Sequence, residues 1–186
     1  MQTHLAFGLL LTVFTSSLAA AAPSNPCEGE ILRASHKYGV PAGILYAVGL
    51  TETGHKGSLQ PYALNIEGKA SFARSPAEAE SIFAAARREG KKLIDVGCMQ
   101  INHHYHSTEF GSLSDMFDPH KNVDYAARFL SNLKRRHATW SMAVARYHAG
   151  PDNDPAQKRY VCRVIANMVA TGFGSWTENA RAFCNQ

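Results

Sequence analysis

Residues 44–54 read ILYAVGLTETG, and this stretch decides the fold that we expect. A proline three residues earlier suits the first turn of a helix, and the final glycine suits its end. Ile44 and Val48 recur at helical spacing, and Glu52 lies four residues after Val48 on the same face. Burial there would raise the pKa of the carboxyl group, as a general acid near neutral pH requires. The alternative is an ordinary exposed glutamate in a last helical turn.

The first 21 residues are typical of a secretory signal peptide. Residues 5–18 are mostly apolar, and residues 19–22 are four alanines that offer cleavage sites, although residues 1–21 contain no Lys or Arg. The apolar stretch is shorter than the roughly 20 residues that a membrane span needs. We therefore expect cleavage near Ala21 or Ala22, no stable membrane span afterwards, and one domain over residues 22–186.

The charge of the chain is mild. The 186 residues carry 19 basic and 15 acidic side chains, a net charge of +4. A small positive net charge favours an anionic polymer or surface as the binding partner, but it does not identify which one. We expect no nucleic acid among the partners.

The four cysteines all lie in the predicted exported part: Cys27, Cys98, Cys162 and Cys184. An even number in an oxidising compartment predicts two disulfides, and four cysteines allow three connectivities. We expect Cys27–Cys184 to tie the chain ends and Cys98–Cys162 to brace the floor of a cleft. No CxxC pair is present, so a zinc ribbon is not indicated.

The remaining patterns predict a mainly α-helical chain with one small sheet. Residues 62–66 and 70–73 flank Glu67-Gly68-Lys69 as a hairpin, and residues 92–96 form a short strand. Helices are expected over residues 28–38 and 75–89, from residue 118, after Thr139, from residue 154 and near residues 175–184. The fold class is therefore α+β, mainly α, with a small antiparallel sheet in an insertion.

Three separated blocks carry a family resemblance. They are Glu52-Thr53, Gly97-Cys98-Met99-Gln100 and Arg146-Tyr147-His148-Ala149-Gly150. In this order they resemble the signature blocks of the soluble lytic transglycosylases, whose pattern is Glu-Ser, Gly-Leu-Met-Gln and Ala-Tyr-Asn-Ala-Gly. The resemblance implies a lysozyme-like, goose-type fold that acts on the glycan strands of peptidoglycan. The insertion that ends in DVGCMQIN (residues 95–102) is similar to the small members that accompany secretion, conjugation and pilus systems, which become candidate partners.

The resemblance also implies roles for single residues. Glu52 would be the catalytic acid and base, and Thr53 would replace the family serine that orients it. Met99 and Gln100 would line the cleft floor beside the sugars. Tyr147 would point its hydroxyl at the Glu52 carboxyl, and His148 stands where the family has asparagine. The substrate-binding set is therefore Thr53, Met99, Gln100, Tyr147 and His148.

The implied reaction is that of a periplasmic or secreted lytic transglycosylase. It cleaves the bond between N-acetylmuramic acid and N-acetylglucosamine, leaves a 1,6-anhydro end and needs no cofactor. The alternatives are a lysozyme-like hydrolase that uses water and a non-catalytic wall-binding assembly protein. A hydrolase normally needs a second carboxylate. Asp95 is the best candidate, although we expect it to cap or brace the turn into Gly97.

Residues 103–106 read HHYH and raise the question of a metal site. Metal ligands must converge, and no HExxH motif is present. We therefore expect a solvated loop here and no metal.

Overall fold

The computed structural model describes residues 25–55, 57–150 and 152–185. The predicted signal peptide lies outside these residues. Helices dominate the described part, and their bounds are α1 (Pro26–Tyr38), α2 (Ala42–Thr53), α3 (Pro76–Arg88), α4 (His103–His106), α5 (Leu113–Phe117), α6 (Pro119–Arg136), α7 (Trp140–His148), α8 (Asp154–Ala170) and α9 (Glu178–Cys184), with a 3-10 turn at Ser107–Glu109.

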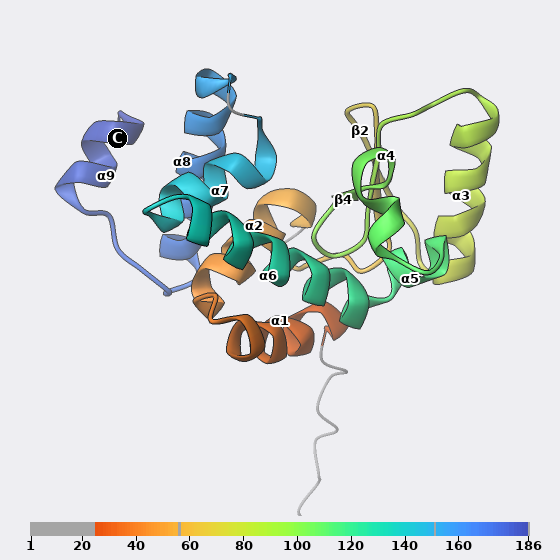
Figure 1. Cartoon of the computed structure of the whole chain (residues 1–186), viewed down its shortest axis with the longest axis horizontal. Helices are drawn as coiled ribbons and strands as arrows, with labels where there is room; N and C mark the ends of the chain where they lie inside the picture. Colours follow the sequence, from red (N-terminus) through yellow and green to blue (C-terminus); the bar gives the residue numbers. More distant parts are fainter. Residues whose placement is uncertain (1–24, 56, 151, 186) are drawn as a thin grey trace, which may run out of the picture.

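The sheet lies between α2 and α6 in sequence and forms one side of the molecule (Figure 1). Its strands are β1 (Ala63–Ile66), β2 (Lys69–Phe72), β3 (Ile94–Val96) and β4 (Ile101–Asn102), in the antiparallel order β2-β1-β3-β4. The register pairs Asn65 with Asp95 and Asp95 with Asn102. The expected fold class is confirmed: a mainly helical α+β chain with a small antiparallel sheet.

Helix starts follow the polar caps in the sequence. Ser75, Asp118 and Thr139 each accept a hydrogen bond from a backbone N–H of the first turn of α3, α6 and α7. The expected helices therefore begin where their caps predict. The last helix begins after Thr177, two residues later than the expected cap at Ser175.

The α2 helix is the centre of the helical part. It packs against α1 and α8, while α6 and α7 close the bundle around it. The sequence suggested one apolar face, but α2 is buried on most sides, with Leu45, Ala47 and Val48 fully buried. Gly54 donates its N–H to the Leu50 carbonyl oxygen at 2.9 Å and so closes the last turn, and the helix ends there because its ψ of 109° is not helical. A side chain at this position would clash with the same oxygen.

Two disulfides are present, but the expected pairing is wrong. Cys27 pairs with Cys98, and Cys162 pairs with Cys184. The bridge brings the start of α1 next to the turn that carries Cys98, whereas α9 packs on α8 and lies far from the start of α1 (Figure 1). Cys27 and Cys184 are therefore not tied to each other: one bridge joins α1 to the Cys98 turn, and the other joins α9 to α8.

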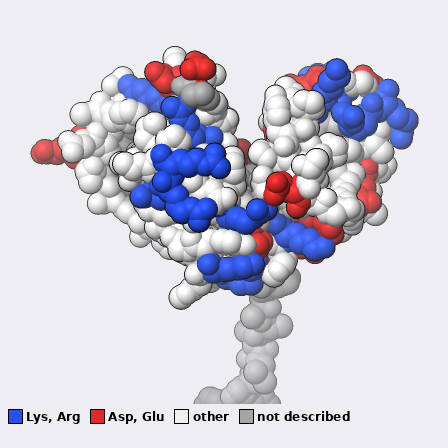
Figure 2. All heavy atoms as spheres, in the orientation of Figure 1, with Lys and Arg blue, Asp and Glu red and all other residues white. Residues whose placement is uncertain are grey.

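The segment between β4 and α6 contains more helix than the sequence predicted. Residues 103–106 are the short helix α4 and not a loop, and α5 precedes α6. No helix among the described residues has both the length and the apolar character to cross a membrane. A notch separates the sheet side from the side of α7 and α8 in the space-filling view (Figure 2).

Candidate active site

Glu52 lies in the last turn of α2 and lines a cleft of about 310 Å³. Its side chain is 16% exposed. Burial raises the pKa of Glu52 to about 7; the Tyr160 hydroxyl and the Arg163 charge lower this pKa, while the Asp95 carboxylate raises it further. The direction agrees with the raised pKa that the sequence predicted for this carboxyl.

Tyr160 holds the Glu52 carboxyl. It lies on α8, is fully buried, and its hydroxyl donates to Oε1 of Glu52 at 2.5 Å. The prediction that Tyr147 makes this contact is wrong, because Tyr147 donates to the Met99 carbonyl oxygen at 2.8 Å. Tyr160 was missed because it continues the apolar face of α8, with Val161 and Val164, and so is typical of a core residue.

His148 packs against the ring of Tyr160, the residue that holds Glu52. Its ring stacks parallel to Tyr160, with centroids 4.2 Å apart, and its Nδ1 lies 4.0 Å from Oε1 of Glu52. Burial lowers the pKa of His148, and the charges of Arg163 and Arg159 lower this pKa further. The imidazole is therefore neutral at neutral pH, and it takes the place of the family asparagine as a neutral polar group.

The turn after β3 is held by a buried amide on α6. Gly97 has a φ of +79°, and a side chain there would meet the Asn122 side chain. Asn122 donates to the carbonyl oxygens of Val96 and Met116 at 3.0 and 2.8 Å and accepts from the Met99 N–H at 2.9 Å. Three backbone groups of the turn and of α5 are thus fixed by one side chain.

This turn directs Gln100 and Met99 to opposite sides. Gln100 has a φ of +47°, lines the cleft and donates to the carbonyl oxygens of Ala63 and Gly97. Met99 is fully buried, with its sulfur close to Gly49 of α2. Gln100 therefore lies on the cleft surface, as the sequence predicted. Met99, which was also predicted there, lies beneath that surface.

Thr53 also lies beneath the cleft, since its side chain is buried. Its hydroxyl lies 3.0 Å from the Cys98 carbonyl oxygen and 3.1 Å from that of Gly49. It ties the end of α2 to the Gly97–Gln100 turn. Thr53 thus fixes the backbone near Glu52. The sequence predicted that it would contact a ligand directly, but its side chain is buried and does not reach the cleft.

The cleft between the sheet and the helices combines polar and aromatic walls. The sheet side supplies Asn65, Asp95, Gln100, Ile101 and Asn102; the helices supply Glu52, Tyr105, His106, Phe129, Tyr147 and His148. Amide groups can hydrogen-bond hydroxyls, and aromatic faces can pack against the apolar faces of a sugar ring. The cleft is therefore suited to an extended polar ligand with flat apolar faces.

A family model for the transglycosylase SLT domain matches residues 30–166, more than half of the chain. This range contains Glu52, the Gly97–Gln100 turn, His148 and Tyr160. The chain belongs to the soluble lytic transglycosylase family. Its members are lytic transglycosylases that act on peptidoglycan outside the cytoplasm. No curated protein and no solved structure matches the chain.

Asp95 gives this transglycosylase domain a second carboxyl in the cleft. It lies within β3 and does not cap the turn into Gly97, but it does brace that turn: its Oδ1 accepts from the Asn102 amide at 2.6 Å, on the strand that follows the turn. Burial raises the pKa of Asp95, while the Asn102 hydrogen bond lowers it. Cross-strand pairing places Asp95 between Asn65 and Asn102, so its side chain has two amide neighbours at the cleft wall.

The histidine run forms the short helix α4 and not a loop; His103 and His106 are half-buried, while His104 and Tyr105 are exposed. His103 packs on Phe83, and Nδ1 of His106 lies 2.7 Å from the Tyr125 hydroxyl. Burial lowers the pKa of both histidines. The described part of the chain has no group of three or more His, Cys, Asp or Glu side chains placed to hold a metal ion.

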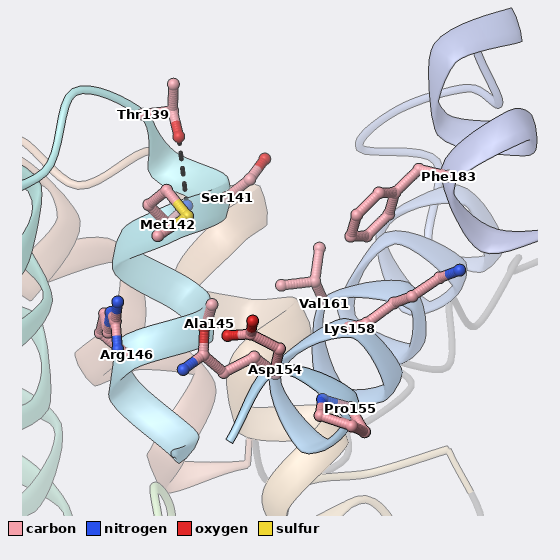
Figure 3. Close-up of a pocket in the computed structure, with 11 residues that line it drawn as sticks. Thr139, Ser141, Met142, Ala145, Arg146, Asp154, Pro155, Lys158, Val161 and Phe183 are labelled. Carbon is pink, nitrogen blue, oxygen red and sulfur yellow. Dashed lines mark hydrogen bonds between the residues drawn. The ribbon is translucent and has the colours of Figure 1, made fainter. Parts of the chain in front are cut away.

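A larger pocket of about 690 Å³ lies between α7, α8 and α9, away from Glu52 (Figure 3). Met142, Ala145, Val161 and Phe183 give it a mainly apolar lining. Its acidic lining residue, Asp154, is exposed at the start of α8, so size alone does not identify the chemical site of this transglycosylase domain.

Proposed function

We propose that this protein is a peptidoglycan lytic transglycosylase that cleaves the β-1,4 bond between N-acetylmuramic acid and N-acetylglucosamine. The observation that carries the proposal is the Glu52 carboxyl: buried, with a pKa of about 7, and held by Tyr160 at the edge of an open polar cleft. Gln100, Tyr147 and His148 would contact the sugars. Thr53 and Met99 would act from beneath by fixing the end of α2 and the turn.

In the first step protonated Glu52 donates its proton to the glycosidic oxygen, and the bond from that oxygen to the muramic anomeric carbon breaks. In the second step the Glu52 carboxylate takes the proton from the muramic 6-hydroxyl. The freed oxygen bonds to the anomeric carbon and closes the 1,6-anhydro ring. Glu52 ends protonated, no water is consumed, and no cofactor takes part. A pKa near 7 suits a group that must both give and take a proton at neutral pH.

An internal nucleophile also fits the geometry around Glu52. The muramic 6-hydroxyl is already tethered beside the anomeric carbon, so its attack avoids much of the entropic cost of holding a water molecule. His148 and Tyr160 pack on one side of the carboxyl, while the cleft in which the muramoyl unit would lie is open to it.

A hydrolase is the second candidate because Asp95 lines the same cleft and acts electrostatically on Glu52. Inverting glycosidases place their two carboxyls roughly 6.5–9.5 Å apart, with the second one activating water. Asp95 would be that base. Its hydrogen bond to Asn102 suggests instead a group that shapes the cleft wall.

Product analysis tests the proposal. Purified protein is incubated with peptidoglycan in water labelled with heavy oxygen, and the products are read by mass spectrometry. We expect muropeptides one water lighter than hydrolysis products, without label. The Glu52→Gln variant should lose at least about 10²-fold in rate, since its amide cannot donate the proton. Labelled reducing ends would support the hydrolase, and the absence of any product would support a non-catalytic wall-binding protein.

The setting we propose is the periplasm or the cell exterior, after removal of residues 1–21. Two disulfides are compatible with an oxidising compartment. Local wall opening for a secretion, conjugation or pilus apparatus is the proposed biological role, and it rests on the resemblance of the insertion ending at residues 95–102. A Glu52→Gln gene that restores apparatus assembly in a deletion strain would contradict this role.

A further inference from the structure

Two arginines lie on α8 beside Tyr160, the hydrogen-bond partner of Glu52, one helical turn apart. Arg159 and Arg163 are both exposed, and their i, i+4 spacing puts them on the same face of the helix. The Arg163 guanidinium lies over the Tyr160 ring, 5.7 Å from its centroid. Tyr160 in turn holds Glu52. Arg163 is therefore one side chain away from the acid that reacts, and Arg159 lies one helical turn before it.

The charges of this pair act on the cleft. Arg163 influences the protonation of both Glu52 and His148, and Arg159 influences that of His148. His148 lines the cleft and stacks on Tyr160. Because Arg163 lies over Tyr160 and Arg159 shares its helix face, the pair adds positive charge to the α8 side of the cleft rim, next to Tyr160 and His148.

Neither arginine is neutralised within the described part of the chain, where no carboxylate lies within 4.0 Å of either one. Six other cations of the described part do have such partners, while others such as Lys158 do not: Arg33 and Lys37 pair with Asp124, Arg74 with Glu78, Lys91 with Glu67, Lys121 with Asp115, and Arg128 with Glu109. The planar forks of Arg159 and Arg163 are thus free to bind a carboxylate from outside.

The substrate offers such carboxylates near this rim. Muramic acid carries a short peptide on its lactyl group, and that peptide has free carboxylates. We infer that Arg159 and Arg163 bind the peptide-stem carboxylates of the muramoyl unit next to the scissile bond, which makes peptide-bearing strands the preferred substrate. The inference rests on the proposed function, since it needs the muramoyl unit to lie against Glu52.

Lys158 supplies a matched control on the same helix. It is exposed and carries the same charge, but its ammonium group lies over the Phe183 ring, 5.4 Å from the centroid, in the pocket between α7, α8 and α9 (Figure 3). Lys158→Gln removes one positive charge from α8 without removing one from the cleft rim.

The experiment compares two substrates for each protein: glycan strands with intact peptides, and the same strands stripped of peptides by an amidase. The readout is the ratio of kcat/KM between the two. Each of Arg159→Gln and Arg163→Gln should lower this ratio about threefold, and the double variant about tenfold, because exposed ion pairs contribute modestly and nearly additively. Lys158→Gln should leave the ratio unchanged. Replacing each arginine with lysine should give an intermediate ratio, since lysine keeps the positive charge but loses the planar guanidinium group that can bind a carboxylate through two hydrogen bonds.

The ratio separates substrate recognition from effects on the acid. Removing Arg163 also changes the protonation of Glu52, but that change acts on both substrates and cancels. An unchanged ratio in the double variant, or an equal fall with Lys158→Gln, would overturn the inference and leave the proposed function standing. Wild-type protein that cleaved neither substrate would overturn both.

Discussion

The Tyr160 hydroxyl and the Glu52 carboxyl are joined by a 2.5 Å hydrogen bond between residues 108 positions apart in the sequence. The bond favours the carboxylate, while burial favours the protonated acid. Burial has the larger effect, so the pKa of Glu52 settles at about 7 and not near its usual value. The packing of α2 against α8 therefore sets both the position and the protonation of the acid.

Tyr160→Phe should move the pH dependence of the reaction. The first step needs protonated Glu52, so kcat/KM falls as the pH rises through the Glu52 pKa of about 7. Without the hydroxyl the carboxylate loses a donor, the pKa rises, and the alkaline limb moves to higher pH. We also expect about a tenfold lower maximal rate, since the loss of one hydrogen bond frees the carboxyl to rotate. A pH profile of kcat/KM measures both effects; an unmoved limb would contradict this account.

Local signals predicted most helices because the information lies within a few residues. Ser75, Asp118 and Thr139 accept from N–H groups three residues ahead, so each start is encoded in four or five consecutive residues. The position of Glu52 on a buried helix end was predictable for the same reason. The family blocks placed Gln100, Tyr147 and His148 correctly at the cleft.

Long-range pairing was not predictable in the same way. The choice of Tyr160 over Tyr147 as the partner of Glu52 depends on how α8 crosses α2, and no local pattern fixes that crossing. The cysteine pairing likewise depends on α1 lying next to the Cys98 turn. Gly97 and Gln100 both have a left-handed backbone conformation, and this conformation directs the Met99 side chain into the core. The residue order of a motif does not reveal such a backbone conformation.

Asn122→Ala should destabilise the protein by about 3 kcal/mol. The change leaves the Met99 N–H and the Val96 and Met116 carbonyls without their buried partner and also opens a small cavity. Urea unfolding measures the loss. Asn132→Ala on the same helix is the control, because Asn132 is only half-buried and bonds to the exposed Arg135; it should cost less than about 1 kcal/mol. Equal costs would contradict the role of Asn122.

The two disulfides should differ in what they support. Removing Cys27–Cys98, which spans 71 residues, should cost about 4 kcal/mol by loop entropy, and removing Cys162–Cys184, which spans 22, about 3 kcal/mol. The first bridge holds the turn beside Glu52, so its paired alanine variant should also lose activity under conditions where it remains folded. The second holds α9 to α8 and should leave the folded enzyme active. Thermal unfolding and turnover of both variants test this; the reverse order of activity loss would contradict it.

Asp95→Asn should separate the two candidate chemistries. In a transglycosylase Asp95 transfers no proton, so the variant should keep at least about a third of the activity, because its amide can still reach Asn65 and Asn102 after a flip. The charge of Asp95 raises the pKa of Glu52, so its removal lowers that pKa and moves the alkaline limb of kcat/KM to lower pH, opposite to Tyr160→Phe. In a hydrolase Asp95 would activate water, and the variant should lose about 10²-fold or more. We expect the variant to remain active, to release unlabelled anhydro products and to show an alkaline limb of kcat/KM that has moved to lower pH. An inactive variant, together with labelled reducing ends from the wild-type protein, would identify a two-carboxylate hydrolase.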